Sequence, residues 1–299
     1  IREAPKTKKE RRQEAARAAE AKKESPRYPS QAELTAEADE EAPQTFLTVT
    51  NAQGAIVRRL VVPGGRGLHR FTWNLRGPGP ALPPPQRPDD DGDGGGFGGQ
   101  QALGAFVPPG TYTLALSRRV DGTTSALGAP QALVVSPDAA VTLTPAAITS
   151  AREFQERVFR LQRTLTGALE QANQYRTRTQ AMRRAVAESA AAARLLDMAV
   201  GLDRRVVGVL RTLRGDETLR GLESGSPSTI QSRVNAATAG ARGLTGAPTG
   251  TQQQHYTIAN DDLGAVVPQL RTLEGDIRKF EQELEAAGVP YTPGRWPGQ

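Results

Sequence analysis

Cysteine is absent from this 299-residue sequence, which excludes disulfide bonds and thiolate metal sites. Aromatic residues make up only 5% of the chain, which is few for the stacking surfaces that bind single-stranded nucleic acid. The sequence also lacks an apolar run of the roughly 18 residues from which a membrane-spanning helix is recognised. These absences argue against nucleic-acid binding and against a transmembrane segment in this chain.

The charge of the chain is spread along it. The formal net charge is +6. Residues 1–27 carry ten Lys and Arg against five Asp and Glu, whereas residues 28–45 carry five acids and no base. Nucleic-acid-binding proteins typically gather Lys and Arg on one face. We therefore predict no nucleic-acid partner.

Residues 1–44 are strongly charged, and their apolar content is almost entirely alanine. Such a segment has little surface to bury on folding. Glu and Lys or Arg residues four apart between residues 6 and 23 would support a solvated helix. We predict a charged linker that is either flexible or a single helix, with a docking arm for a partner as the alternative.

Residues 45–138 change to short apolar runs separated by Gly and Pro, which predicts an Ig-like antiparallel β-sandwich. The turn Asn51-Ala52-Gln53-Gly54 predicts a hairpin, because Gly54 tolerates a positive φ. In GLHRFTWNLRGPGP, residues 67–80, we interpret His69 and Arg76 as parts of a strand rather than a reactive site, with Arg76 facing outward or towards the adjoining helices. Alternation predicts a structural core of Phe71, Trp73, Leu75, Tyr112 and Leu114.

A Gly- and Asp-rich loop, residues 83–101, interrupts the predicted sandwich. Its residues Asp89, Asp91 and Asp93 resemble the oxygen ligands of calcium loops. Such loops need fixed ligand spacing and usually a bidentate Glu at the end, which is missing here. The three aspartates are therefore a weak calcium candidate, and a plain surface loop is favoured.

Residues 139–299 follow a helical period, which predicts an antiparallel three-helix bundle. A Gly- and Ser-rich loop at about residues 215–250 interrupts it, with room for a short helix at residues 230–239. Pro268 is expected to start or kink the third helix. The predicted seams are Phe154, Val158, Leu161, Leu165, Ala168, Ala172 and Tyr175; Leu195, Met198, Leu202, Val206, Val209 and Leu213; and Val266, Leu270, Leu273, Ile277, Phe280 and Leu284.

No recognisable catalytic pattern is present in the sequence. The histidines, His69 and His255, belong to no metal-ligand spacing. The sequence contains neither a Gly-x-Ser-x-Gly nucleophile elbow nor a phosphate-binding Gly loop with Lys. We predict that this chain alone is not an enzyme and requires no cofactor.

An ordered series of motifs resembles one known family. VTNAQGAIVRRL, GLHRFTWNLRGPGP and VPPGTYTLAL are followed by APTGTQQQHYTIANDDL and LEAAGVPYTPGRWPGQ. Over residues 45–299 the series resembles the C-terminal portion of bacterial sortilin-like (VPS10, BNR-repeat) β-propeller proteins, often labelled glycosyl hydrolases. The resemblance implies an upstream pair of propellers and export to the periplasm or the cell exterior. Asn74 stands where the family's Trp-Asp-Leu-Arg run has an acid, and no catalytic residue carries over.

Three hypotheses of function follow. The first is a non-catalytic accessory or structural region of an exported sortilin-like protein, which packs on the propellers or mediates protein–protein contact. The second is an independent protein- or glycan-binding module. The third is part of a glycosyl hydrolase whose active site lies in the propellers.

Because the sequence begins with Ile, we expect a piece of a longer protein, with any signal peptide upstream. Trp296, in the tail, is a candidate anchor to another surface.

Overall fold

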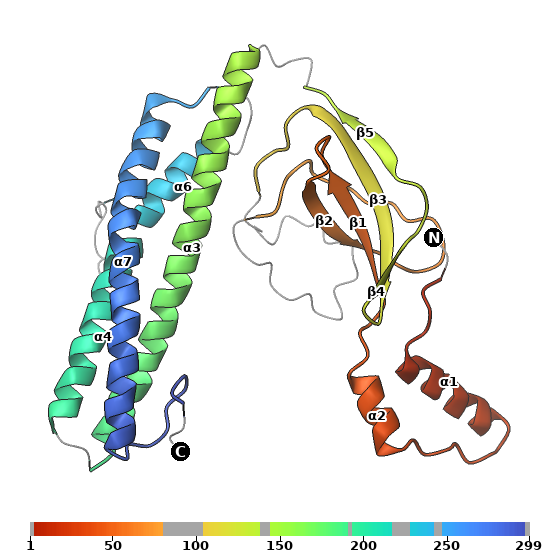
Figure 1. Ribbon diagram of the computed structural model, residues 1–299, viewed down its shortest axis with the longest axis horizontal. Helices are drawn as coiled ribbons and strands as arrows, with labels where there is room; N and C mark the ends of the chain where they lie inside the picture. The colour runs from red at the N-terminus through yellow and green to blue at the C-terminus, as the bar shows by residue number, and fades with distance from the viewer. Residues whose placement is uncertain are drawn as a thin grey trace. The chain divides into compact units, whose positions relative to one another are not determined.

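A computed structural model describes residues 3–79, 104–137, 144–190, 193–216, 228–241 and 247–296. In these residues the chain is mixed α+β, as predicted, with six helices and a five-stranded antiparallel sheet (Figure 1). The chain divides into two compact units. One unit holds two short helices and the sheet, and the other, the helical unit, holds the four remaining helices.

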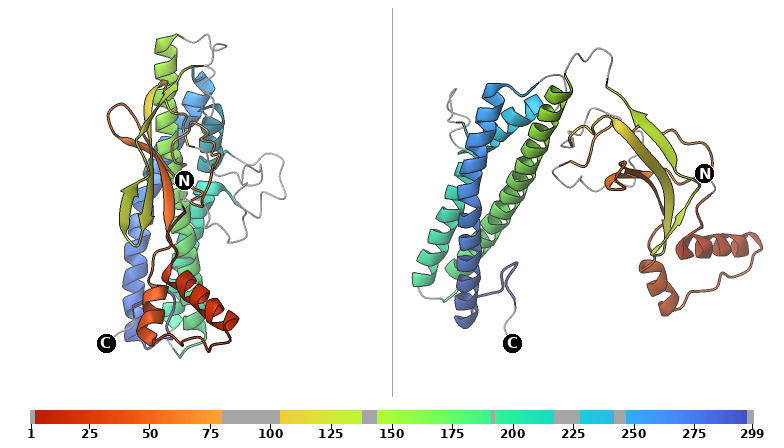
Figure 2. Two further views of the ribbon diagram at one scale, coloured as in Figure 1. Left: turned by 90° about the vertical axis from the view of Figure 1, so that its right-hand side faces the viewer. Right: turned by 45° about the horizontal axis from the view of Figure 1, so that its top comes forward.

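The sheet has the strand order β2-β1-β3-β4, and β5 also pairs with β3. β3 pairs with β5 through its first residues and with β4 through its last. β2 therefore forms one edge of the sheet, and β4 and β5 share the other (Figures 1 and 2). The strands are β1 Gln44–Thr50, β2 Ile56–Val62, β3 Gly110–Val120, β4 Thr123–Ala126 and β5 Gln131–Val135.

The predicted hairpin between β1 and β2 is confirmed. Gly54 has a φ of 76°, and its N–H donates to the carbonyl oxygen of Asn51 over 3.0 Å. The Asn51 side-chain oxygen also accepts from the N–H of Gln53 at 3.1 Å and from that of Ala55 at 2.9 Å. These local bonds close the turn and fix the register that pairs Leu47 with Leu60.

One small apolar cluster lies against the sheet. Val49, Val107 and Tyr112 are buried at its centre. Trp73 and Leu114 pack against them, and the rings of Trp73 and Tyr112 meet edge to face with centroids 6.0 Å apart. Edge-to-face pairs add about 0.5–1.5 kcal/mol beyond the area that they bury. Three of the residues predicted in the core therefore lie in this cluster.

The predicted strand around Trp73 is not formed. Leu75 has a φ of 56° and Gly67 a φ of 129°, values that interrupt an extended chain. Phe71 and Leu75, both predicted in the core, are instead 41% and 36% exposed. The alternation of apolar residues therefore does not produce a strand face here, and the described strands pair into one five-stranded sheet.

The helical unit is built on two long helices that run in the same direction, with a third running the opposite way (Figure 1). α3 starts at Pro145, with Thr144 as its N-cap, and α7 starts at Gly250 with a capping box between Thr249 and Gln252. α7 continues through Pro268, so this proline does not start the helix. The helices are α3 Pro145–Ala187, α4 Ala193–Arg214, α6 Ile230–Ala241 and α7 Gly250–Ala286.

Two shorter helices, α4 and α6, complete the packing of α3 and α7. Asp203 of α4 contacts Thr179 of α3, whereas Ala237 of α6 packs with Phe154 and Val158 near the start of α3. α4 therefore packs on the C-terminal half of α3, and α6 packs nearer its N-terminus. All predicted seam residues are buried except Met198, which is partly buried. None of the helices in the described ranges is both long enough and apolar enough to cross a membrane.

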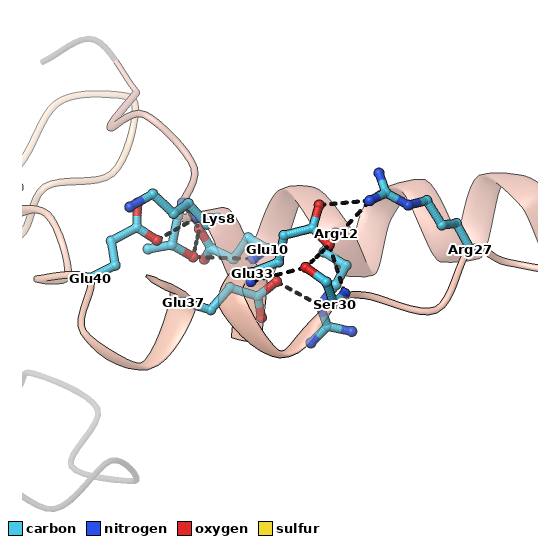
Figure 3. Close-up of polar contacts among 9 residues, drawn as sticks. Lys8, Glu10, Arg12, Arg27, Ser30, Glu33, Glu37 and Glu40 are labelled. Carbon is cyan, nitrogen blue, oxygen red and sulfur yellow. Dashed lines mark hydrogen bonds and ion pairs between the residues drawn. The ribbon is translucent and has the colours of Figure 1, made fainter. Parts of the chain in front are cut away.

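The N-terminal residues form two helices, α1 Lys8–Ala21 and α2 Gln31–Ala38, where a flexible linker or one helix was predicted. Each begins with a capping box, and hydrogen bonds from Thr7 and Ser30 lower the pKa of Glu10 and Glu33 respectively. Figure 3 shows the ion pair that joins the helices, in which Arg12 Nε lies 2.7 Å from Glu37. Neither helix has a buried residue, so polar contacts and caps rather than an apolar core hold this pair.

Candidate functional site

The segment around Trp73 and Arg76 is a structural cluster. Arg76 is buried, and its guanidinium carbon lies 3.6 Å from the centre of the Phe106 ring. The indole N–H of Trp73 donates to the carbonyl oxygen of Arg76 over 3.0 Å. Of the two directions predicted for Arg76, the outward one is therefore wrong, because a cation gains from stacking on an aromatic face. Arg58 of β2 donates a hydrogen bond to the carbonyl of Gly77, and burial lowers the pKa of Arg58.

The two histidines lie in different units. His69 is exposed, and its Nε2 lies 2.7 Å from the carbonyl oxygen of Gly65. His255 lies near the start of α7 in the helical unit. Among the described residues, no group of three His, Asp or Glu side chains is arranged to hold a metal ion. The weak calcium candidates Asp89, Asp91 and Asp93 lie outside the described residues.

A buried carboxylate joins α3 to α4. Asp203 is only 5% exposed, and one of its oxygens accepts a hydrogen bond of 2.9 Å from the hydroxyl of Thr179. The same oxygen contacts Arg176, and the other lies 3.7 Å from Arg183. Both oxygens are therefore engaged, which suits a residue that positions two helices rather than one that transfers protons. The sequence itself shows that Asp203 lies beside the apolar stripe of α4, next to Leu202.

The chain beyond α7 folds back on its own helix end. We call residues 288–296 the C-terminal hook. Gly288 has a φ of 65°, and the N–H of Val289 donates to the carbonyl of Leu284 over 3.0 Å, as in a Schellman motif. Arg295 donates to the carbonyl of Val289 at 2.6 Å and lies 3.0 Å from the carboxylate of Glu285. Both Val289 and Arg295 are buried, so the hook is a defined structure.

The hook also packs against α3. A Cβ added at Gly294, whose φ is 90°, would lie 3.0 Å from Nε of Arg178. Arg178 is itself held by Glu281 of α7, whose carboxylate accepts a hydrogen bond of 2.6 Å. The close approach leaves no room for a side chain at this position, so glycine is the residue that fits. The backbone of the hook is thereby placed against an arginine whose position is fixed by an ion pair.

Two aromatic side chains of the hook remain in solvent. Trp296 is 88% exposed and Tyr291 is 62% exposed, whereas Thr292 between them is 2% exposed. Large exposed aromatic residues on an ordered backbone are typical of protein interaction sites. The hook is therefore the candidate functional site of the helical unit. Trp296, the anchor proposed from the sequence, does not pack on its own unit in the described residues.

The sequence contains one local signal for the hook. Gly288 directly after the last helical turn, followed by an apolar residue, is the pattern of a Schellman cap. That pattern predicts that Val289 packs back on the helix. The burial of Arg295 has no comparable local signal, because the side chain reaches back along the chain to Val289 and Glu285.

Comparison with known proteins adds no relative, since no family model, curated protein or solved structure matches this chain.

Proposed function

We propose that this chain is a non-catalytic accessory region of an exported sortilin-like β-propeller protein, and that its C-terminal hook attaches it to another protein surface. The observation that carries this proposal is the contrast within the hook. Val289, Thr292 and Arg295 are buried and fix the backbone, while Tyr291 and Trp296 are exposed.

An ordered hook lowers the cost of binding. Side chains on a backbone that is already fixed lose less conformational freedom when a partner covers them. Trp and Tyr are also enriched among the residues that dominate interface energies. The two exposed rings are therefore suited to a protein partner, and the fixed turn between them keeps their spacing constant.

The partner and the finer fold come from the family resemblance. We propose as the partner an upstream β-propeller region of the same polypeptide, in the periplasm or outside the cell. The Ig-like sandwich and the antiparallel three-helix bundle, with boundaries at residues 45–138 and 139–299, belong to this proposal. Another protein that offers an apolar pocket for an indole ring is the next partner to test.

The experiment measures binding of this chain to the separately produced propeller region. Trp296→Ala and Tyr291→Ala are each expected to weaken binding at least about tenfold, since removing a central interface aromatic typically costs 2 kcal/mol or more. Tyr28→Ala is the matched control, because Tyr28 is also 87% exposed but lies outside the hook. Equal binding by all three variants and the unchanged chain would refute a role for the hook.

The exposed aromatic rings also suit a glycan, because sugars stack on aromatic faces. Binding of the chain to immobilised glycans, lost in Trp296→Ala, would favour the independent glycan-binding module. The hydrolase hypothesis places the active site in the propellers, so the chain alone is expected to turn over no glycoside or peptide substrate. Turnover by the chain alone, abolished by one acid substitution, would overturn the accessory role.

A further inference from the structure

A second surface of the helical unit has the features of a binding site. A hollow of about 230 Å³ lies between the N-terminal halves of α3 and α7. Its lining includes the short residues Thr164, Asn260 and Gly264, where longer side chains would fill the space. A Cβ added at Gly264 would meet no atom within 4 Å. The full lining is Arg157, Arg160, Leu161, Thr164, Tyr256, Asn260, Leu263, Gly264 and Val267.

The floor of the hollow is apolar. Leu161 and Leu263 are buried, and Tyr256 and Val267 are partly buried beside them. A cavity of about 150 Å³ already holds a benzene molecule, whereas sites for drug-sized ligands span about 300–1,000 Å³. A volume of about 230 Å³ therefore suits one large apolar side chain better than a whole cofactor.

Two positive charges stand beside this floor. The guanidinium carbon of Arg157 lies 5.6 Å from the centre of the Tyr256 ring and 5.8 Å from the centre of the Phe154 ring. These two ring contacts hold Arg157 near the hollow. Arg157 and Arg160 have no ion pair with any carboxylate of the described residues. Elsewhere in the unit the arginines that pair with carboxylates include Arg176, Arg178, Arg194, Arg205 and Arg278. The hollow is thus complementary to a ligand that carries negative charge.

Pro268 interrupts the hydrogen-bond ladder of α7 beside the hollow. Proline has no N–H, so Pro268 cannot donate the regular helical bond to the carbonyl of Gly264, a residue that lines the hollow.

We propose that this hollow binds an acidic peptide segment. One large apolar side chain of the peptide enters the hollow, and flanking Asp or Glu carboxylates pair with Arg157 and Arg160. The site is independent of the C-terminal hook. Arg160 and Arg178 are separated along α3 by about 27 Å, at roughly 1.5 Å per residue.

The test uses fluorescently labelled pentapeptides and the whole chain. Glu-Glu-Leu-Glu-Glu is expected to bind, and to bind more weakly as salt screens the charges. Glu-Glu-Ala-Glu-Glu, which lacks the anchor, and Lys-Lys-Leu-Lys-Lys, which reverses the charge, are each expected to bind at least about tenfold more weakly. Tighter binding of a short single-stranded oligonucleotide than of the acidic peptide would overturn the assignment to a peptide.

Matched variants separate binding from folding. Gly264→Leu fills the hollow and places a better helix former in α7, and Gly275→Leu makes the same change at another open position of the same helix. The first is expected to abolish peptide binding and the second to leave it within about twofold, with unchanged circular dichroism. Arg157→Gln with Arg160→Gln is expected to weaken binding about tenfold, and the exposed control Arg163→Gln is not. Equal binding within either matched set would overturn the proposal, whatever the outcome at the hook.

Discussion

Replacing Arg295 with alanine tests how the C-terminal hook is held. The residue is 7% exposed, and its Nη2 donates to the carbonyl of Val289 over 2.6 Å. Alanine removes a charged donor and takes this partner from the carbonyl, which costs about 1.5–3 kcal/mol. Because the hook lies outside the helices, the cost falls on its local opening rather than on unfolding of the helices.

The opening is measured by amide hydrogen exchange. The N–H of Val289 is bonded to Leu284 and that of Arg295 to Thr292, at 3.0 and 3.1 Å. At about 1.4 kcal/mol for each factor of ten, amides of the hook in Arg295→Ala should exchange about 10–150 times faster. The amides of α4 should keep their rates.

Arg194→Ala is the control for loss of an arginine. Arg194 lies 3.1 Å from the carboxylate of Glu283, but its side chain is 69% exposed. Exposed pairs contribute about 1 kcal/mol or less, so exchange in the hook should accelerate less than about fivefold. Unchanged exchange in Arg295→Ala, or equal acceleration in both variants, would refute the reasoning that the buried arginine holds the hook.

Other predictions concern the two cores. Burial raises the pKa of Tyr175 above its usual 10.0, and nearby Glu274 adds to the rise. The folded state holds the phenol proton more tightly, so this stabilisation is complete below pH 10 and lost as pH rises through the raised pKa. Thermal midpoints of Tyr175→Phe should therefore fall less at alkaline pH, and an equal fall would contradict this. Phe280→Ala should cost about 3–5 kcal/mol in urea unfolding followed by helical circular dichroism, and a loss below about 1 kcal/mol would contradict its place in the core. Trp73→Ala should cost about 2–4 kcal/mol because the ring is partly buried, whereas His69→Ala should cost under about 0.5 kcal/mol, and equal losses would contradict the cluster.

The helical unit could be predicted well because its pattern is local and repeated. Apolar residues at steps of three and four, from Phe154 to Tyr175 in α3, place one stripe of the helix inside, and every predicted member of that stripe is buried. A stripe of this kind can be predicted without knowing which helix packs against it. The same pattern continues through Pro268, which lies inside α7 and does not start it, so of the two predictions for this proline the start is wrong.

The segment around Trp73 could not be predicted in the same way. Alternating Phe71, Trp73 and Leu75 indicate a strand face, but positive φ at Leu75 ends the extended chain. The indole of Trp73 bonds to a carbonyl three residues later, which is a turn that period-two reasoning does not anticipate. Short apolar runs next to glycine carry too little information to distinguish a strand from a set of turns.

The candidate site was predicted only in part, for a different reason. Trp296 was noted as an anchor because a lone Trp among Pro and Gly is conspicuous, and its exposure agrees with that role. The hollow between α3 and α7 is lined by residues of two helices, and these residues lie about 100 positions apart in the chain. Local patterns do not reveal which faces of α3 and α7 meet, so the sequence could not predict that Gly264 and Asn260 line a hollow.

The small cluster of Phe154, Val158 and Ala237 is separate from the large core of the helical unit. Fewer apolar contacts hold this end, so it should open more readily than the rest, as a cooperative unit of lower stability. Tyr256, which lines the peptide hollow, packs against this cluster and also against the large core. Occupation of the hollow would then raise the free energy of opening by mass action. Protection of this end of the helical unit from hydrogen exchange or proteolysis would therefore increase with the fraction of molecules whose hollow is occupied.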